Sequence, residues 1–384
     1  MLPLSDVRVI EFCNVAAGPY CGMLLGDMGA DVIKVEHPQG GDTMRAWPPI
    51  TDGYSENFAS VNRNKRSVTL DLKDPGDRAR ALELVRGADV LIENNRPGVM
   101  KRLGLDYDTL KRDQPGLVYC SISAFGQEGP RSGEGGFDLT TQAMSGIMSV
   151  TGEAGGAPVK CGVPLSDFCA GLYAAYAIAA VLTRVRGGGD GEHIDVPMLG
   201  TSLAVAALQT SEYFGTGRDP QKLGSAHPRN APYQAFQAAD GYFAMAAGND
   251  GLWKSVCKAV DLPALADDPR FTSTSLRTNN QAVLKTILEV EFATHTTAEM
   301  LAKFRAVGVP CAPINSYSQA LADEQVQHMA WVQEITLPSG KRTRTFGSPL
   351  RFSGKGFEIR RDPPALGQHN DELLGSVAAE EAAR

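Results

Sequence analysis

The stretch VRVIEFCNVAAGPYCGMLLGDMGADVIKVE, residues 7–36, decides the fold class. Apolar residues dominate 7–12 and 30–36, which predicts two fully buried strands. Residues 18–28 between them predict a helix with Pro19 in its first turn. A strand, a helix and a second strand form a βαβ unit, whose two strands are parallel. The chain therefore opens with the start of a parallel sheet.

Glycines at the start of a βαβ unit also suggest a dinucleotide site, but their spacing argues against one. Gly18, Gly22 and Gly26 recur every four residues, so they lie along one helix face, where a neighbour can pack closely. The GxGxxG pattern instead places its glycines in the loop that approaches a pyrophosphate. An NAD-dependent oxidoreductase stays a minor alternative, and no GxxxxGK[ST] phosphate loop occurs.

The alternation of strands and helices continues beyond the first unit. The sequence predicts further strands and two further helices, one at 75–86 and a long one opened by Ser166 and Asp167; the strands are 67–72, 89–93, 117–122 and 192–196. This order predicts an α/β fold with a mostly parallel sheet covered on both faces.

The pattern changes after about residue 225. Two short strands are expected within 233–246, followed by helices at 250–260, 280–292 and 297–307 and a strand at 309–314. A hairpin is expected within 331–352 and a last helix near Asn370. The sequence thus predicts a large discontinuous domain over 1–224 and 326–384, with a smaller α/β domain over 225–325.

Composition places the chain in the globular class. It has 384 residues, of which 43% are hydrophobic and 21% charged, and a net charge of −7. No block of five or more basic residues occurs, which argues against nucleic acid or an anionic membrane as the main partner. An anionic ligand would have to be held by a local basic pocket.

The cysteines and the apolar segments indicate where the protein resides. The seven cysteines are scattered without a CxxC pair, and the N-terminus lacks a signal-peptide pattern, which predicts a reducing cytoplasm. Residues 168–183 carry no charge but fall just short of the roughly 17 residues that a bilayer span requires. We expect this segment to be a buried core helix. The six histidines form no HxxxH or HExxH pair, so no metal site is expected.

Motifs spread along nearly the whole chain occur in one order. They include LGDMGADVIKVE at 25–36, NRNKRS at 62–67, ENNRPG at 93–98, GVPLSD at 162–167 and LGQH at 366–369. Together they resemble the family III CoA-transferases, the group of formyl-CoA transferase, carnitine CoA-transferase and the α-methylacyl-CoA racemases. The resemblance implies a Rossmann-like large domain, a smaller α/β domain and an interlocked homodimer. It also implies a CoA thioester as substrate, with no permanently bound cofactor.

The resemblance implies that Asp167 is the nucleophile. Asp167 would attack an acyl-CoA thioester to give a mixed anhydride, the CoA thiolate would return to form an aspartyl-CoA thioester, and an acceptor carboxylate would then take the CoA. Without the family, Asp167 is an N-cap or first-turn acid of a long helix. Both can be true, because the positive end of the helix dipole is expected to keep the carboxylate ionised.

Asp138 is the second catalytic candidate, although an ordinary loop acid after Gly135 and Gly136 fits the sequence nearly as well. The racemases resemble GHD at the place where this chain has Gly136-Phe137-Asp138. Their histidine serves as one of two acid/base groups, since stereoinversion needs a proton donor and an acceptor on opposite faces. Phe137 therefore favours the transferase over the racemase.

CoA-binding residues follow from the same resemblance. Their positions hold small, polar, apolar and basic residues, and the basic ones suit phosphate groups: Ala16, Ala17, His37, Leu70, Lys73, Asn94, Arg102 and Met198. Ala16 departs from the glutamine frequent in the family, and His37 departs from an arginine. Each of these residues could instead be an ordinary core or surface residue.

The segment GSAHPRN at 224–230 resembles the succinyl-CoA:glutarate and related dicarboxylate CoA-transferases. A dicarboxylate needs a fixed cation for its second carboxylate. The candidates are Arg45, Arg66, His227 and Arg229, with Trp47 as a possible pocket wall, and each could instead be structural. We therefore expect an acyl-CoA:carboxylate CoA-transferase using succinyl-CoA and a small dicarboxylate or sulfinate analogue. A 2-methylacyl-CoA racemase is the alternative within the family.

Overall fold

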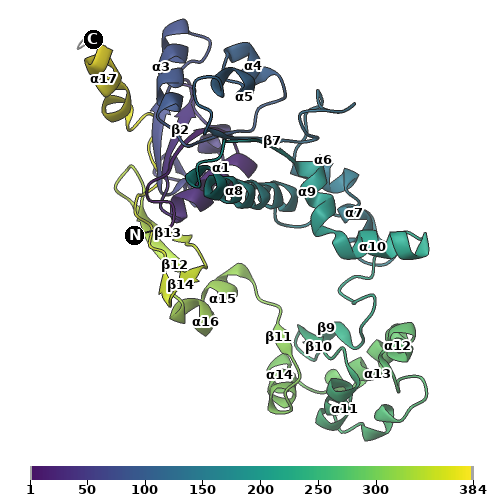
Figure 1. Cartoon of the computed structure of the whole chain (residues 1–384). Coiled ribbons are helices and arrows are strands. Elements are labelled where there is room, and N and C mark those ends of the chain that lie inside the picture. The colour runs from purple at the N-terminus through teal and green to yellow at the C-terminus, as the bar shows by residue number, and fades with distance from the viewer. Residues whose placement is uncertain (1, 382–384) are drawn as a thin grey trace. The chain divides into compact units, whose positions relative to one another are not determined.

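The computed structural model describes residues 2–381, which divide into two compact units (Figure 1). The sheet unit comprises the residues up to Ile147, Lys160–Arg218 and the residues from Glu324 onward; the small unit comprises Met148–Val159 and Asp219–Asp323. The sequence assigned 148–159 to the large domain. In the structure this segment groups with the small unit, and Gly152 accepts the N–H of Gly224 at 3.0 Å.

The sheet unit is built on six parallel strands in the order β5-β2-β1-β6-β7-β8. Their bounds are β1 Arg8–Phe12, β2 Asp31–Glu36, β5 Lys65–Thr69, β6 Val90–Glu93, β7 Val118–Ser123 and β8 His193–Pro197. All six predicted strands are present, with bounds shifted by at most three residues. The strand order reverses between β1 and β6, and in doubly wound sheets ligands bind at the carboxyl ends of the strands at such a point.

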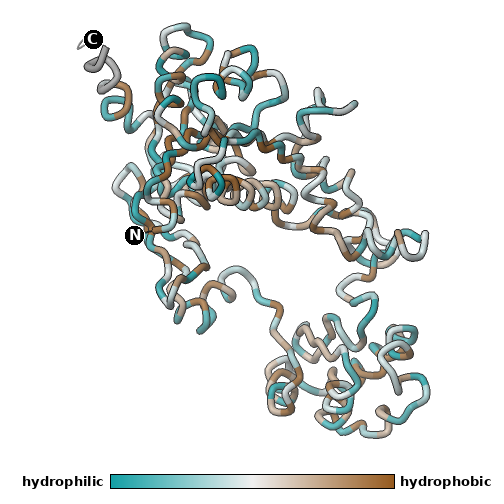
Figure 2. The backbone as a smooth tube through the Cα atoms, in the orientation of Figure 1, coloured by the Kyte–Doolittle hydropathy of each residue, from teal (hydrophilic) through white to brown (hydrophobic). Residues whose placement is uncertain are grey.

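Helices cover both faces of this sheet, as the alternation predicted. One face packs against α1 (Ala17–Asp27) and α8 (Leu165–Arg186), the other against α3 (Pro75–Arg86), α4 (Val99–Leu103) and α17 (Asn370–Glu381). In Figure 2 many residues of the central strands and of α8 have the colour of hydrophobic residues. The strands are fully buried in the middle of the sheet, which explains their continuous apolar runs.

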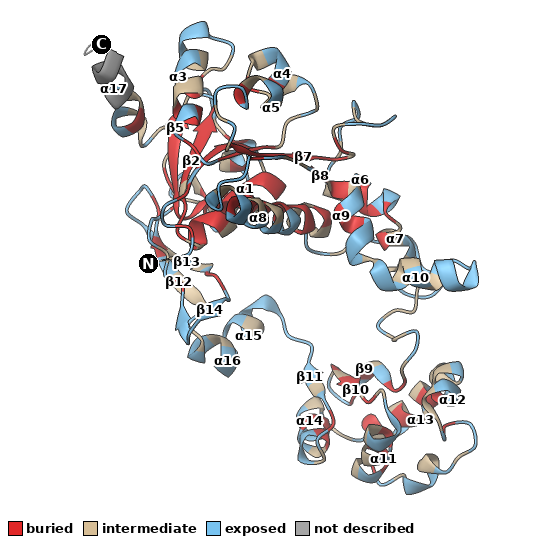
Figure 3. Ribbon diagram, viewed as in Figure 1, coloured by how far each residue is buried: buried red, intermediate tan, exposed pale blue. Residues whose placement is uncertain are grey.

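The helix α8 differs from the expectation of a buried helix. Its length and composition would suit a membrane span, yet one face packs on the sheet and on α1. On the other face Leu172, Tyr173 and Tyr176 are exposed, Tyr176 to 72% (Figure 3). The helix also begins at Leu165 after Pro164, so Asp167 is not its cap but lies in its first turn.

Several helices of the sheet unit carry no strong sequence signal and were not predicted. They are α2 (Glu56–Asn62), α5 (Tyr107–Leu110), α6 (Asp138–Met144), α9 (Met198–Val205), α10 (Ala207–Thr216), α16 (Glu324–His328) and the short η1 (Thr43–Ala46), with α7 (Ile147–Val150) at the unit boundary. The tail hairpin is confirmed as β12 (Val332–Thr336) paired with β13 (Arg342–Phe346). Two further two-stranded ribbons are β3 (Ile50–Thr51) with β4 (Tyr54–Ser55) and β14 (Arg351–Phe352) with β15 (Lys355–Gly356).

The small unit has a three-stranded antiparallel sheet in the order β11-β10-β9. The strands are β9 (Tyr233–Gln237), β10 (Tyr242–Ala246) and β11 (Cys311–Pro313); the helices are α11 (Asp250–Ala259), η2 (Pro263–Ala266), α12 (Thr274–Asn279), α13 (Gln281–Phe292), α14 (Thr297–Ala306) and α15 (Tyr317–Leu321). Phe236, Phe243, Phe292 and Phe304 form its aromatic core, with neighbouring ring centroids 5.4–6.2 Å apart.

Candidate active site

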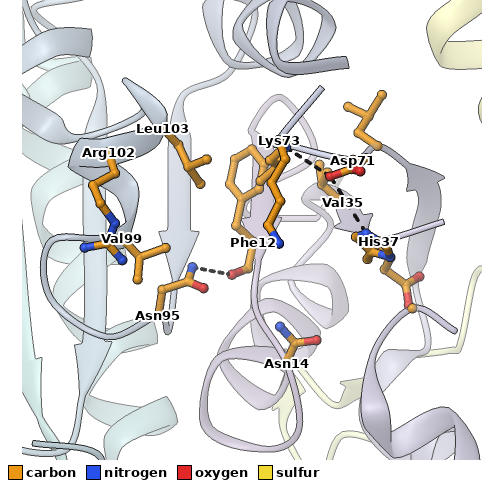
Figure 4. Close-up of a pocket in the computed structure, with 14 residues that line it drawn as sticks. Phe12, Asn14, Val35, His37, Asp71, Lys73, Asn95, Val99, Arg102 and Leu103 are labelled. Carbon is orange, nitrogen blue, oxygen red and sulfur yellow. Dashed lines mark hydrogen bonds and ion pairs between the residues drawn. The ribbon is translucent and has the colours of Figure 1, made fainter. Parts of the chain in front are cut away.

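A pocket of about 420 Å³ lies at the carboxyl ends of β1, β2, β5 and β6, where the strand order reverses (Figure 4). Its walls come from the ends of these strands, from the loops after them and from α4. The lining residues are Phe12, Asn14, Val35, Glu36, His37, Gly41, Leu70, Asp71, Leu72, Lys73, Asn95, Val99, Arg102 and Leu103. Four residues predicted to bind CoA are among them, namely His37, Leu70, Lys73 and Arg102.

The polar side chains of the pocket are arranged to receive an anion. Figure 4 shows Lys73 extending between Arg102 and His37. Among the residues described, Lys73 and Arg102 have no ion-pair partner, while Asp71 lies 3.8 Å from Nε2 of His37. Two cations without a protein counter-charge beside apolar Val99 and Leu70 suit a ligand with phosphates and an apolar part.

The other residues predicted to bind CoA do not line this pocket. Asn94 accepts the N–H of Asn14 at 2.9 Å and donates to its carbonyl at 2.8 Å, which fixes the loop after β1. Ala16 precedes α1 and Ala17 opens it, and both are buried. Met198 opens α9 and is buried in the core. Through its side chain each of these three residues contributes apolar packing.

The carboxylate of Asp167 differs from most buried carboxylates of the protein in its contacts. Within the part of the chain that the structure describes, its side chain has no hydrogen-bond or ion-pair partner. Burial, and second the negative charge of Asp138, raises the pKa of Asp167 to about 7. From the sequence, the helix dipole is expected to keep this carboxylate ionised, which would lower its pKa. That expectation is wrong, because burial and the like charge of Asp138 raise the pKa instead.

Asp138 is held beside Asp167 by two hydrogen bonds, and a third fixes its partner Gln142; the sequence revealed none of them. Its Oδ1 accepts the N–H of Ser166 at 2.9 Å, and its Oδ2 accepts from Nε2 of Gln142 at 2.8 Å. The carbonyl oxygen of the Gln142 side chain accepts the N–H of Cys161 at 2.9 Å. Asp138 is therefore not a loose loop acid, because it opens α6 and ties that helix to the start of α8.

Asp167 and the pocket lie at the same edge of the sheet. The helix α1 follows β1 and so begins at the carboxyl edge, and α8 leads into the parallel strand β8 and so begins there too. The first turns of the two helices touch, since the rings of Tyr20 and Phe168 lie 4.5 Å apart. A Cβ on Gly171 would lie 2.7 Å from the carbonyl oxygen of Ala17, so only glycine permits this close approach.

Two of the arginines predicted to bind a second substrate carboxylate are already paired within the chain. Arg45 binds Glu36 through two nitrogens at 2.7 Å each, and its guanidinium lies 3.8 Å from the ring centre of Phe58. Arg66 binds Asp31 and Glu372. Both guanidinium charges are neutralised by carboxylates of the protein itself.

The remaining substrate candidates divide between the two units. Trp47 belongs to the sheet unit and is 44% exposed. His227 and Arg229 belong to the small unit, where Nδ1 of His227 accepts the N–H of Arg229 at 3.1 Å. The His227 ring lies 5.0 Å from that of Tyr233, and burial followed by the charge of Arg229 lowers the pKa of His227.

Asn14, Asn95 and Gln142 belong to the site but were not predicted. Asn95 donates to the carbonyl of Phe12 at 3.3 Å, and its own N–H is accepted by Glu93 at 2.8 Å. Asn95 does stand in the ENNRPG motif, so its place after a buried strand was an available signal. Asn14 likewise follows a buried strand, β1, whereas Gln142 offered no such signal.

Comparison with known proteins decides the family. The model of CoA-transferase family III matches residues 4–370. The chain belongs to that family. It is 39% identical to the succinate–glutarate CoA-transferase of Agrobacterium fabrum, over 98% of this chain and 96% of that protein. It is also 38% identical to the acetyl-CoA:oxalate CoA-transferase of Acetobacter aceti, over 99% and 97%.

A solved structure supports the same family. The crystal structure of a CAIB/BAIF family protein from Brucella suis superposes with a TM-score of 0.86 at 37% identity, and the match covers 99% of each chain. The resemblance drawn from the separated motifs is thus confirmed, and the protein is a family III CoA-transferase whose substrates are CoA thioesters. The alternative of an NAD-dependent oxidoreductase is wrong.

Proposed function

We propose that this family III CoA-transferase moves CoA from a donor such as succinyl-CoA to a small dicarboxylate or a sulfinate analogue, with Asp167 as the nucleophile. One observation carries the proposal. A carboxylate without a partner among the described residues lies at the sheet edge that also holds a pocket with two unpaired cations, Lys73 and Arg102. The names of the relatives from Agrobacterium and Acetobacter support dicarboxylate acceptors.

The reaction follows from the chemistry of two carboxyl derivatives. The ionised Asp167 attacks the thioester carbonyl, forms a mixed anhydride and releases the CoA thiolate. The thiolate attacks the aspartyl carbonyl of the anhydride, which gives an aspartyl-CoA thioester and the free donor acid. The acceptor carboxylate attacks that thioester, and the thiolate then attacks the acceptor's side of the new anhydride. The acyl-CoA product leaves and Asp167 is restored as a carboxylate.

Different residues of the pocket bind different parts of CoA. Lys73, Arg102 and His37 supply positive charge or donors for the phosphates, and Leu70 supplies an apolar wall. Asn94 fixes the loop that carries Asn14. The buried Ala16, Ala17 and Met198 shape the start of α1 and α9 around the reacting groups.

The charge of Asp138 helps to raise the pKa of Asp167, so this carboxyl group is not fully ionised at neutral pH. A carboxylate whose pKa lies near 7 is a stronger nucleophile than an ordinary aspartate, and at neutral pH about half of it is ionised. Phe137 stands where the racemase resemblance requires histidine, and its side chain is 76% exposed. The transferase reaction needs no acid/base pair at that position.

The second carboxylate of the acceptor is assigned to the loop 224–230. Arg45 and Arg66 are bound to carboxylates of the chain. We favour Arg229, with His227, because both stand in the segment GSAHPRN that resembles the dicarboxylate CoA-transferases. Trp47 stays a candidate wall for the acyl group.

We also propose a homodimer that acts in a reducing cytoplasm. The helix α8 exposes Leu172, Tyr173 and Tyr176, and α10 exposes Phe214 to 82%. A second copy of the chain would bury such a surface. The seven cysteines are all free thiols, which suits a reducing compartment.

The test is a mass-spectrometric assay of acyl-CoA products. The enzyme is incubated with succinyl-CoA and a panel of mono- and dicarboxylates, and the Asp167→Ala variant serves as control. New acyl-CoA species that depend on Asp167 and favour dicarboxylates are the expected result. Transfer that persists in the variant would remove Asp167 from the mechanism. Absence of any new thioester, together with exchange of the α-proton of a 2-methylacyl-CoA, would establish the racemase instead.

A further inference from the structure

The turn between β1 and α1 adopts a conformation that its sequence does not favour. Val15 has a φ of +66°, in the left-handed region, which a β-branched residue rarely enters. Such a backbone persists only where the surrounding structure holds it. This turn carries Asn14, which lines the CoA pocket, and leads into Ala16 and Ala17 at the start of α1.

The group that holds this turn is the carboxylate of Asp42. Its two oxygens lie 3.0 and 3.1 Å from the backbone nitrogen of Val15 and accept its N–H. Oδ1 also accepts the N–H of Met44 at 2.9 Å. Asp42 is fully buried, and it comes from a distant loop after β2 rather than from the turn itself.

A buried lysine anchors the carboxylate. Nζ of Lys34 lies 3.0 Å from Oδ2 of Asp42, 3.0 Å from Oε1 of Glu11 and 2.7 Å from the carbonyl oxygen of Cys13. Lys34 therefore binds both the carboxylate of Asp42 and the backbone carbonyl of Cys13, where the turn begins. The side chains of all three charged residues are fully buried, so the arrangement is rigid.

The loop that delivers Asp42 is also a wall of the pocket. His37 and Gly41 line the pocket, and the N–H of Asp42 is bound by Glu36 at 3.0 Å. Gly41 has a φ of +64°, and a Cβ there would lie 2.7 Å from Oε2 of Glu36. Asp42 thus joins the two walls of the pocket, the loop 37–42 and the turn that presents Asn14.

We propose that Asp42 is a positioning residue for CoA: by binding the N–H of Val15 it holds the β1–α1 turn in the strained form that presents Asn14 to the pocket. The inference rests on the proposed function only in taking the pocket as the CoA site. Asp42 touches no reacting atom. Its loss therefore weakens the binding of CoA more than it slows the transfer at saturation.

The experiment compares Asp42→Asn and Val15→Gly with a matched buried carboxylate. Asp27 in α1 is 3% exposed and binds Arg63 at 2.7 Å, away from the pocket lining, so Asp27→Asn is the control. The affinity for free CoA is measured by calorimetry, KM and kcat with succinyl-CoA, and the melting temperature by circular dichroism. Val15→Gly keeps the N–H that Asp42 binds but removes the strain of a β-branched residue at positive φ, and the double variant with Asp42→Asn keeps the test valid if Asp42→Asn alone folds poorly.

The expected result is a rise in the Kd for CoA of about tenfold in Asp42→Asn, with kcat changed by less than about twofold, and a Kd near that of the wild type in Val15→Gly. Asp27→Asn should lower the melting temperature and leave Kd unchanged. Because glycine adopts this φ without the restraint, Asp42→Asn should raise the Kd less in the Val15→Gly background than in the wild type. An unchanged Kd in Asp42→Asn, or fully additive effects, would overturn the proposal. Calorimetry needs no turnover, so a wild-type enzyme that binds CoA but transfers none would refute the proposed function alone.

Discussion

Oδ1 of Asp138 accepts the backbone N–H of Ser166 at 2.9 Å, so this carboxylate is fixed one residue before the proposed nucleophile, Asp167. The bond ties the start of α6 to the first turn of α8. It also fixes two negative groups near each other in a partly buried region, where ionisation of either opposes ionisation of the other. The charge of Asp138 therefore adds to the effect of burial in raising the pKa of Asp167.

The charge of Asp138 should be visible in the pH profile. Asp138→Asn keeps an acceptor for the Ser166 N–H but removes the charge, which is the second cause of the raised pKa of Asp167. Burial is the first cause and stays, so we predict that the acidic limb of kcat/KM moves down by about 0.5–1 pH unit. Rate measurements between pH 5 and about 9 test this. A limb at the wild-type position would show that Asp138 does not act on Asp167 by charge.

The raised pKa of Asp167 also predicts a change in stability with pH. The folded protein holds the proton up to about pH 7, and the unfolded chain releases it near pH 3.8. Between these values the folded state binds more protons, so stability falls as pH rises and the full cost is present above pH 7. Asp167→Asn lacks this cost.

We therefore expect Asp167→Asn to be more stable than the wild type at alkaline pH. The gain is about 1–3 kcal/mol at pH 8 and close to zero near pH 4. Urea unfolding of both proteins at the two pH values measures it. A gain of the same size at both values would mean that a cause other than titration of Asp167 is responsible.

The buried strands could be predicted from the sequence, whereas an exposed helix could not, and the reason is physical. Residues 7–12 and 30–36 were predicted as strands and observed as Arg8–Phe12 and Asp31–Glu36, because a strand buried on both faces must be apolar throughout. The helix α10 was missed. None of its residues is buried in this chain, so it has no apolar stripe to detect.

The sequence predicted several residues of the site, but it did not predict which side chains contact one another. Lys73 and Arg102 lie in the pocket, but the sequence cannot show that Glu36 faces Arg45 and neutralises it, since that contact depends on the fold. The same limit hid the contact between Asp138 and Ser166. Motifs identify which residues matter, and the order of strands decides which of them meet.

Phosphate recognition can be tested on Lys73 and Arg102, the two pocket cations without an ion-pair partner among the described residues. Removal of a charge-assisted hydrogen bond should raise the KM for acyl-CoA by about 5–50-fold in Lys73→Ala and in Arg102→Ala, while kcat changes little. The control is Lys101→Ala, since Lys101 is exposed on the same helix as Arg102 but does not line the pocket. Steady-state kinetics with varied succinyl-CoA distinguish these variants. A similar KM in all three would exclude this pocket as the phosphate site.

The close contact between α1 and α8 predicts that Gly171 tolerates no side chain. A Cβ there would lie 2.7 Å from the carbonyl oxygen of Ala17 and 3.0 Å from the Tyr20 ring. Gly171→Ala should destabilise the protein by about 1–3 kcal/mol and lower kcat, because it displaces the turn that carries Asp167. Gly215→Ala is the control, since no atom lies within 4 Å of its Cβ position in α10. Thermal unfolding and kcat together should separate the two variants; equal behaviour would contradict the contact.

The last prediction separates the arginines proposed for the acceptor from those that serve the fold. Arg45→Gln leaves the buried Glu36 without its cation, whose presence now lowers the pKa of Glu36 against the effect of burial. Breaking such a pair should cost about 2–4 kcal/mol of stability. Because Arg45 is committed to Glu36, the ratio of KM values for dicarboxylate and monocarboxylate acceptors should stay constant in Arg45→Gln.

Arg229→Gln should behave in the opposite way. Loss of one charge-assisted contact to the second carboxylate should raise the KM for a dicarboxylate acceptor such as glutarate by about tenfold. The KM for a monocarboxylate of the same length should not change, because it has no second carboxylate to lose, and the melting temperature should stay near that of the wild type. Initial rates with paired acceptors at saturating succinyl-CoA give both constants. Equal effects on the two acceptors would assign Arg229 to the structure of the loop, and a selective effect in Arg45→Gln would return that role to the sheet unit.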